Sequence, residues 1–419
     1  MTHPDPDHGG SRADVSTPAP ADRPAPADRP APAASGGPDQ TDRVILRTAA
    51  DEQGLSGPGP VLVLDDATGE LTAAALAEHA EAAADGSAPV ISWAGSYATT
   101  DALRRRFRDE IAAGRLQVPG GDRPIPVADV AVSARPRLAL MRLPKALADL
   151  EHRCRDLAGA GEVTLVAGGR VKHMTRSQNE VLARVFAEVH ASRGLGKSRT
   201  LVASSPREHI EPAATATGIA RVRVRGQERD LAVRGIGGVF GGASADAGSL
   251  LLLEALDRSL PGATGPAGEP DAAATISAID LGSGNGLLTA YLAAALPAAR
   301  VLASDDDADA VASTRATLAA NGLTRESIAV TWDASLSRVA DGTADLVVLN
   351  PPFHAGTAID ATLVHGLLDA AARVLRPGGQ LWFVHNSYLR YRPEVEQRVG
   401  PVRQQARDRR FTVLSATRA

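Results

Sequence analysis

Short runs of apolar residues alternate along this chain with longer segments whose apolar residues recur at helical spacing. In the first half, this pattern predicts strands at 61–64, 90–93, 138–141 and 163–167, and helices at 71–84, 100–113 and 146–157. In the second half, it predicts strands at 276–280, 301–305, 345–349 and 380–385, one helix that begins at Leu287 and another that ends at Asn321-Gly322. Apolar runs without alternation are typical of parallel strands buried on both faces. The sequence therefore predicts an α/β fold with two tandem units, each a doubly wound, mostly parallel sheet.

Shifts in composition divide the chain further. Residues 1–40 are rich in Pro, Ala and Asp, and the six residues at 19–24 recur at 25–30. Such a segment has almost nothing to bury, so we expect a disordered tail. The first α/β domain is predicted over 41–203, with order beginning near Arg43, and the second over 219–419. Between them, the Pro-, Thr- and Ala-rich residues 204–218 are predicted to form a linker.

The bulk composition narrows the class of protein. No apolar run approaches the length of a membrane span, and the first residues lack the pattern of a signal peptide. The single cysteine, Cys154, excludes an intrachain disulfide and a cysteine-based zinc cluster. We therefore expect a cytoplasmic enzyme that needs neither a membrane nor a metal. The net charge is −4, but residues 380–419 carry eight arginines and three acidic residues, which suits either a phosphate-bearing substrate or a solvated helix face.

A glycine-rich turn lies between a predicted strand and a predicted helix. Gly282, Gly284 and Gly286 alternate along Asp280-Leu281-Gly282-Ser283-Gly284-Asn285-Gly286. Glycines let a backbone approach a ligand closely, and the N-terminus of a helix favours a carboxylate or phosphate. The spacing is G-x-G-x-G rather than the G-x-G-x-x-G of dinucleotide sites. A tight structural turn remains the alternative.

The next predicted strand ends in an acid. Asp305 lies where doubly wound nucleoside sites place a carboxylate that binds the ribose hydroxyls. Its neighbours Asp306 and Asp307 could take that role, and an N-cap for the following helix is the structural alternative.

The most specific motif follows the strand at 345–349. It is Asn350-Pro351-Pro352-Phe353. Two prolines remove backbone donors, which leaves the Pro351 carbonyl as an acceptor beside the side-chain oxygen of Asn350. Two such acceptors can hold the N–H groups of an exocyclic amine, and Phe353 can stack on a base. An ordinary Pro-Pro turn is the structural alternative.

These motifs resemble class I S-adenosylmethionine-dependent methyltransferases, and the Asn-Pro-Pro-Phe form is similar to enzymes that methylate planar amino groups. The resemblance extends to the ribosomal RNA guanine-N2 methyltransferases of the RlmG and RsmC type, which pair a catalytic domain with a degenerate methyltransferase-like one. The segments that carry it in the second half are 238–240, 246–248, 350–354, 378–379 and Asn386. In the first half, 59–64, 77–79, 143–145 and 172–173 look more like RlmG, which acts on large-subunit RNA.

The resemblance implies tandem Rossmann-like methyltransferase domains, S-adenosylmethionine as cofactor, and methyl transfer to N2 of a guanine in ribosomal RNA, with 23S favoured. It implies that Asp280 or Asn285 orients the methionine portion, that Asp305 binds the ribose and that Asp333 is a candidate for the adenine amine. For the target base it implies alignment by Asn350 and Pro351 and stacking by Phe353.

The first domain carries none of these motifs. One glycine follows residues 61–64, no acid follows 90–93, and Leu143-Pro144-Lys145 stands where an Asn-Pro-Pro-Phe motif belongs. The resemblance implies that this domain helps to bind RNA. The candidate residues are Lys145, Arg170, Lys172 and Arg176. We expect the protein to act as a monomer.

Three alternatives stay open on the sequence alone. The target could be a guanine in 16S RNA, or a glutamine side chain of a protein, although a protein target predicts Tyr more often than Phe353. A non-catalytic RNA-binding factor that has kept the fold predicts loss of the glycine turn or of Asn350, and both are present.

Overall fold

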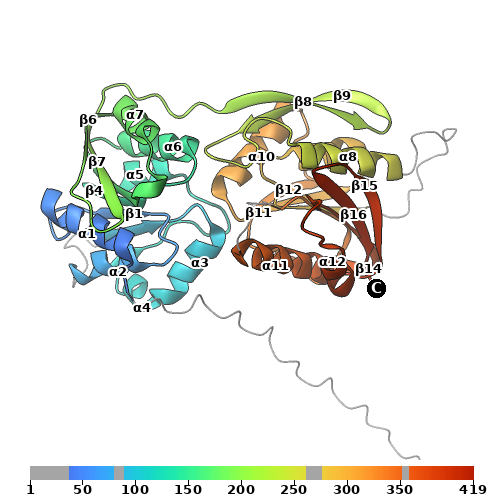
Figure 1. Cartoon of the computed structure of the whole chain (residues 1–419), viewed down its shortest axis with the longest axis horizontal. Helices are drawn as coiled ribbons and strands as arrows, with labels where there is room; N and C mark the ends of the chain where they lie inside the picture. The colour runs from blue at the N-terminus through green and yellow to red at the C-terminus, as the bar shows by residue number, and fades with distance from the viewer. Residues whose placement is uncertain (1–36, 80–88, 261–275, 352–357) are drawn as a thin grey trace, which may run out of the picture. The chain divides into compact units, whose positions relative to one another are not determined.

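Two sheets of mostly parallel strands, flanked by helices, dominate the structure (Figure 1). The computed structural model describes residues 37–79, 89–260, 276–351 and 358–419. Residues 37–419 form one compact unit. The predicted fold class, two α/β domains in tandem, is confirmed.

The first sheet has the strand order β3-β2-β1-β4-β5-β7-β6, in which only β7 runs antiparallel to its neighbours. Its strands are β1 Val61–Leu64, β2 Val90–Trp93, β3 Leu116–Gln117, β4 Leu138–Arg142, β5 Thr164–Arg170, β6 Phe186–Ala191 and β7 Ser198–Pro206. Its helices are α1 Gln40–Glu52, α2 Glu70–Ala77, α3 Tyr97–Arg106, α4 Arg108–Ala112, α5 Val127–Ala134, α6 Leu147–Ala158 and α7 Arg176–Val185, with a short 3₁₀ helix at Val171–His173.

The second sheet repeats this arrangement, in the order β12-β11-β10-β13-β14-β16-β15, with β16 antiparallel to its neighbours. Its strands are β10 Ser277–Leu281, β11 Arg300–Asp305, β12 Ile328–Trp332, β13 Ala344–Leu349, β14 Leu375–Asn386, β15 Val402–Arg407 and β16 Phe411–Thr417. Its helices are α8 Ala247–Ser259, α9 Leu287–Ala295, α10 Ala308–Ala320, α11 Ala358–Val374 and α12 Arg392–Arg398. A hairpin of β8 Ala216–Val224 and β9 Gln227–Gly235 precedes α8.

Several predicted boundaries need correction. The predicted linker 204–218 overlaps two strands, because β7 stays paired with β6 up to Pro206 and β8 pairs with β9 from Ala216. The described chain is ordered before Arg43, and α1 begins inside the predicted tail. The predicted helix 100–113 is two helices, because Phe107 leaves the helical backbone conformation and buries its ring in the core. Most of the predicted tail and residues 80–84 of the predicted first helix lie outside the described residues.

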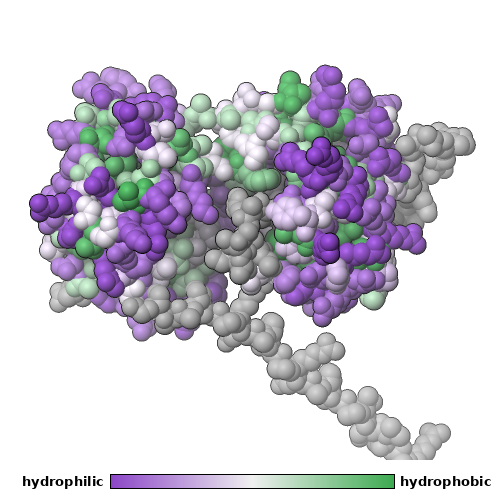
Figure 2. Space-filling view, in the orientation of Figure 1, coloured by the Kyte–Doolittle hydropathy of each residue, from purple (hydrophilic) through white to green (hydrophobic). Residues whose placement is uncertain are grey.

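Each sheet has apolar side chains on both faces, which form the core. β1 and β2 are buried along their whole length, as the apolar runs predicted. Cys154 on α6 is fully buried in the core of the first domain. The face in Figure 2 is largely hydrophilic, with hydrophobic residues scattered over it. Among the described residues, no helix is both long and apolar enough to span a membrane.

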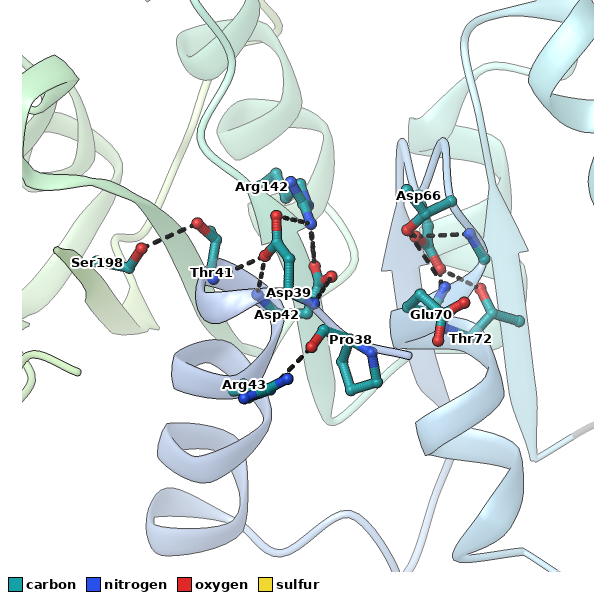
Figure 3. A network of polar contacts seen from close by, with 12 residues as sticks. Pro38, Asp39, Thr41, Asp42, Arg43, Asp66, Glu70, Thr72, Arg142 and Ser198 are labelled. Carbon is teal, nitrogen blue, oxygen red and sulfur yellow. Dashed lines mark hydrogen bonds and ion pairs between the residues drawn. The ribbon is translucent and has the colours of Figure 1, made fainter. Parts of the chain in front are cut away.

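Polar contacts fix α1 on the first sheet (Figure 3). Asp39 caps the helix by accepting hydrogen bonds from the backbone N–H groups of Thr41 and Asp42. Arg142, the last residue of β4, forms ion pairs with Asp39 at 3.0 Å and with the buried Asp42 at 2.6 Å. Because Asp39 and Asp42 are three residues apart, one guanidinium reaches the capping residue and the first turn together.

Candidate functional site

The predicted site residues of the second domain meet at one edge of its sheet. β10 is paired in parallel with both β11 and β13, and Leu281 lies between Ser304 and Leu349 in register. The segments that follow these three strands therefore lie side by side. They contain the glycine turn, Asp305 and Asn350, which the sequence separates by up to about 70 residues.

The three glycines of the turn have different surroundings. All adopt positive φ, +80° at Gly282, +52° at Gly284 and +79° at Gly286. A Cβ on Gly282 or Gly284 would meet no atom of the described residues within 4 Å, whereas one on Gly286 would lie 2.7 Å from the Cα of Thr314 on α10. Gly286 is thus required by helix packing. The first two glycines border open space, as a backbone that cradles a ligand must.

Asp280 is fully buried at the end of β10, directly before this turn. One carboxylate oxygen, Oδ2, accepts a hydrogen bond from the Thr289 hydroxyl at 2.6 Å. The other, Oδ1, has no partner among the described residues. Burial raises the pKa of Asp280 to about 7. A buried, unpaired carboxylate oxygen beside an open glycine turn fits a cationic ligand group that would pair with it.

Asn285 holds a neighbouring loop. Its amide nitrogen donates to the carbonyls of Gly242 and Ser244, both at 3.0 Å, and its oxygen accepts from the backbone N–H of Leu287. Both amide protons are therefore used within the chain. Of the two candidates for the methionine portion, Asp280 is the one that keeps an unpaired atom.

Asp305 joins β11 to the glycine turn. Its carboxylate accepts from the backbone N–H of Gly284 at 2.8 Å and of Asp307 at 3.0 Å, and burial raises its pKa to about 6. Asp307 caps α10 by accepting from the N–H of Asp309. Of the three consecutive acids, Asp305 is the one that the structure places against the turn, so it stays the candidate for the ribose.

Asp333 follows the neighbouring strand β12. Its backbone N–H donates to the carbonyl of Asp305 at 2.9 Å, and its buried carboxylate accepts from the Ser337 hydroxyl and the N–H of Arg338. The structure thus brings Asp333 beside the Asp305 segment, with its carboxylate binding the turn that follows.

Asn350 is oriented by two residues that the sequence-based prediction did not assign to the site. Its amide nitrogen donates to Oδ2 of Asp246 at 3.1 Å and to the hydroxyl of Ser249 at 2.8 Å. Asp246 caps α8 through its other oxygen, and Ser249 lies in the first turn of that helix. Because both amide protons face α8, the side-chain oxygen of Asn350 faces away from α8 as an acceptor.

Asp246 carries a usable signal in the sequence, since Asp before an apolar helix predicts an N-cap, but nothing local links it to Asn350. Pro351 is buried. Pro352 and Phe353, which belong to the predicted catalytic set, lie outside the described residues.

The first domain places different residues at the same positions. Asp66 follows β1, and its carboxylate accepts from the N–H groups of Gly69 and Thr72 and from the Thr72 hydroxyl, so the turn is closed by its own side chain (Figure 3). By strand register, Arg142 is the counterpart of Asn350, one residue earlier than the predicted Leu143. The degenerate character of this domain thus has a structural basis.

No metal centre is found in the described part of the chain, where no three His, Cys, Asp or Glu side chains gather as ligands.

Comparison with known proteins finds a matching family model for each domain. The model of the Methyltransferase small domain family matches residues 230–415, and that of the RLMG N-terminal domain family matches residues 37–208. The ribosomal RNA large subunit methyltransferase G of Pseudomonas paraeruginosa is 31% identical over 367 residues, which cover 87% of this chain and 89% of that protein.

Two further similarities concern a second group. The ribosomal RNA small subunit methyltransferase C of Pseudomonas aeruginosa is 44% identical over 73 residues, 17% of this chain and 22% of that protein. The solved structure of a T. thermophilus 16S rRNA N2 methyltransferase (RsmC), in complex with AdoMet and guanosine, has the same fold, with a TM-score of 0.67 and 24% identity over 91% of this chain and 92% of that one. The extent and identity of the first match decide the assignment: this chain belongs to the family of the ribosomal RNA large subunit methyltransferase G.

Proposed function

We propose that this protein transfers a methyl group from S-adenosylmethionine to the exocyclic N2 amine of a guanine in 23S ribosomal RNA. The observation that supports this best is the orientation of Asn350: its amide nitrogen is held by Asp246 and Ser249, which leaves its side-chain oxygen facing away from α8 as an acceptor. The family supports the choice of RNA, because relatives that match almost the whole chain are named for the large ribosomal subunit.

The residues after β10 and β11 fit the cofactor. When bound, S-adenosylmethionine supplies an electrophilic methyl group on a positively charged sulfur. The open backbone at Gly282 and Gly284 would hold its methionine portion, and the unpaired oxygen of Asp280 would accept from its ammonium group. The carboxylate oxygens of Asp305 have further lone pairs for the ribose hydroxyls. Asp333 is the candidate for the adenine amine.

The residues after β13 would hold the target. The Asn350 oxygen and the Pro351 carbonyl would accept the two N–H groups of the guanine amine, and Phe353 would stack on the base. An amine nitrogen aligned with a sulfonium methyl needs positioning rather than a strong base. The guanine must be unpaired or flipped to expose N2, which favours RNA free of protein.

The first domain is proposed to bind RNA. The candidate cations Lys145, Arg170, Lys172 and Arg176 are exposed. Arg170 ends β5, and the others follow the carboxyl end of β4 or β5. Because β4 and β5 are neighbouring parallel strands, the four residues gather at one edge of the sheet. None of them forms an ion pair within the described residues. Unpaired cations at one edge suit the phosphate backbone of RNA. We expect the acting form to be a monomer in the cytoplasm.

The test is methyl transfer from labelled S-adenosylmethionine to protein-free 23S and 16S RNA, followed by digestion to nucleosides. We expect label in N2-methylguanosine from 23S RNA, and its loss in Asn350→Ala. Label in 16S RNA alone would keep the chemistry and overturn the choice of RNA, an outcome that the local similarity to the small subunit methyltransferase makes worth testing. Cofactor binding without labelling of either RNA would point instead to a glutamine side chain or another amine.

A further inference from the structure

The turn after β11 binds the first helical residues of the other domain. The carboxylate of Asp306 accepts from the hydroxyl of Ser96 at 2.7 Å and from the backbone N–H of Ala98 at 2.8 Å. The carbonyl of Asp306 accepts from the N–H of Tyr97, also at 2.8 Å. The first N–H groups of a helix have no partner within it. Asp306 supplies that partner to α3, from a position directly beside Asp305.

The contact is reciprocal. Ala308, the first residue of α10, donates its backbone N–H to the carbonyl of Gly95 at 2.9 Å. Ser96 and Asp307, which cap α3 and α10 respectively, form an antiparallel bridge with each other. The turns after β2 and after β11 are counterparts in the two sheets. Each therefore completes the start of the other domain's helix.

Trp332 connects a second cofactor segment to the same turn. It is buried at the end of β12, directly before Asp333. Its indole Nε1–H is shared between the carbonyl of Gly95 at 3.0 Å and that of Asp306 at 2.8 Å. Its ring meets the ring of Tyr97 edge-on at 5.3 Å. The segments proposed for the ribose and for the adenine are thus both fastened to the turn at 95–98.

A buried arginine holds the neighbouring part of the contact. Arg153 on α6 pairs with Asp309 in the first turn of α10 at 3.1 Å and with Asp65 at 3.6 Å, and it lies over the Trp93 ring at 4.5 Å. Asp65 follows β1 as Gly282 follows β10. The degenerate glycine turn of the first domain therefore supplies a charge to this contact.

We propose that the first domain sets the affinity for S-adenosylmethionine through this contact, with Ser96, Asp306 and Trp332 as positioning residues for Asp305 and Asp333. The inference rests on the proposed cofactor site. Asp306 fixes the backbone between the ribose carboxylate and α10, and Trp332 fixes the backbone before Asp333. Ligand affinity depends on such pre-arrangement, because a loose site must be ordered on binding.

The test is the dissociation constant of S-adenosylmethionine, measured by calorimetry on the full-length protein and its variants. We expect Asp306→Ala and Trp332→Phe each to weaken cofactor binding at least about fivefold, within the range of coupled sites. Ser96→Ala is expected to weaken it less, and Ser96→Thr, which keeps the hydroxyl, to retain wild-type affinity. The affinity for RNA is expected to stay unchanged.

Asp149→Ala is the matched control. Asp149 accepts a hydrogen bond from the backbone N–H of Gly238 at 2.5 Å. Asp149→Ala therefore removes a carboxylate contact between the same two domains that is made at Gly238 and not at residues 305–308. We expect its cofactor affinity to equal that of the wild type. Equal weakening by Asp149→Ala and Asp306→Ala, or wild-type affinity in both Ser96→Ala and Asp306→Ala, would overturn the inference. A wild-type protein that does not bind S-adenosylmethionine would overturn the proposed function first, and this inference with it.

Discussion

The two domains have the same strand order, and in both a glycine in the left-handed conformation precedes the helix that follows the first strand, β1 or β10. Gly69 has a φ of +73° and Gly286 a φ of +79°. In both helices the third residue, Thr72 or Thr289, donates its hydroxyl to a buried aspartate. The two preceding glycines occur only in the second domain. The fold thus requires the last glycine of the turn, whereas the absence of Gly282 and Gly284 counterparts in the first domain fits their proposed role in holding a ligand.

A second pair of counterparts carries the same lesson. Arg142 bonds the capping residue of α1 and the residue three positions later, and Asn350 does the same with Asp246 and Ser249 on α8. The scaffold around the two side chains is alike. A guanidinium has hydrogen-bond donors only and no acceptor, so Arg142 cannot accept a hydrogen bond from an amine N–H group. The side-chain oxygen of Asn350 can accept one.

The largest expected effect is on the rate of methylation, and it distinguishes Asn350 from Arg142. Asn350→Ala is expected to lower kcat for RNA methylation by about 10²–10³, the usual cost of removing one positioned polar group from a reaction centre. Its affinity for S-adenosylmethionine should stay within about twofold, because Asn350 is proposed to contact the base. Single-turnover methylation and calorimetry measure the two quantities.

Arg142→Ala is the control for that prediction. It should leave kcat unchanged and lower the free energy of unfolding by about 1–2 kcal/mol, a modest value because a third of the arginine side chain is exposed. Loss of activity in a folded Arg142→Ala protein would show that the two positions are not functionally distinct.

The glycine turns give the next prediction. A Cβ at Gly284 meets no atom in the part of the chain that the structure describes, so Gly284→Ala should cost only about 1–2 kcal/mol of stability for its positive φ. The same Cβ would enter the proposed cofactor space, and the dissociation constant of S-adenosylmethionine should rise at least about tenfold. Its counterpart Ala67→Gly should not create a second site. Calorimetry should give one bound cofactor per chain for the wild type and for Ala67→Gly. Two bound cofactors per chain in Ala67→Gly would contradict the distinction drawn between the two turns.

The buried acid predicts a pH dependence. With a folded pKa of about 7 against an ordinary value of 3.8, Asp280 binds more protons in the folded than in the unfolded state between these values. Its contribution to stability is therefore present at low pH and is lost as the pH rises through 7. Between pH 6 and pH 8 the folded group holds on average half a proton, so the loss of stability over this range is about 1 kcal/mol.

Asp280→Asn removes that titration. Urea unfolding of the cofactor-free protein at both pH values should show the wild type losing stability relative to Asp280→Asn as the pH rises. Parallel pH profiles for the two proteins would contradict a raised pKa at this position.

The smallest effect is expected in the first domain. Lys172→Ala and Arg176→Ala should each weaken RNA binding a few-fold and reduce the salt dependence of the binding constant by about one unit of slope, as loss of one phosphate contact does. Cofactor affinity should not change. Filter binding at several salt concentrations measures the slope, and Arg221→Ala, on the exposed β8–β9 hairpin, is the matched control. An unaltered slope in both variants would argue against RNA binding by this edge.

The sequence predicted those parts of the fold whose signal is local. Most of the buried parallel strands and the start of α9 at Leu287 were found, because an apolar run or a glycine turn marks each. The parallel strand β3 was not predicted, because its two residues form no apolar run. β15, β16 and the β8–β9 hairpin were not predicted. In β8 and β15 exposed residues interrupt the apolar ones, so no run marks the strand, and antiparallel pairing to a distant segment stabilises it.

The site divides in the same way. The glycine turn, Asp305 and Asn350 lie in short motifs, and the structure brings them to one edge. The partners of Asn350 were out of reach, because they are more than 100 residues away in the chain. The bonds of Asn285 to residues 242 and 244 likewise depend on a loop that only the folded chain brings near.

The single thiol of the chain offers a measure of local opening. Cys154 is fully buried in the core of the first domain, and burial raises its pKa above the ordinary value, so the reactive thiolate is suppressed in the folded state. In excess maleimide, the labelling rate would therefore follow how often that core opens. Arg153 is adjacent to Cys154 in sequence and pairs with α10 of the second domain. Slower labelling in the presence of S-adenosylmethionine would therefore show that cofactor binding to the second domain makes local opening of the first domain's core less frequent.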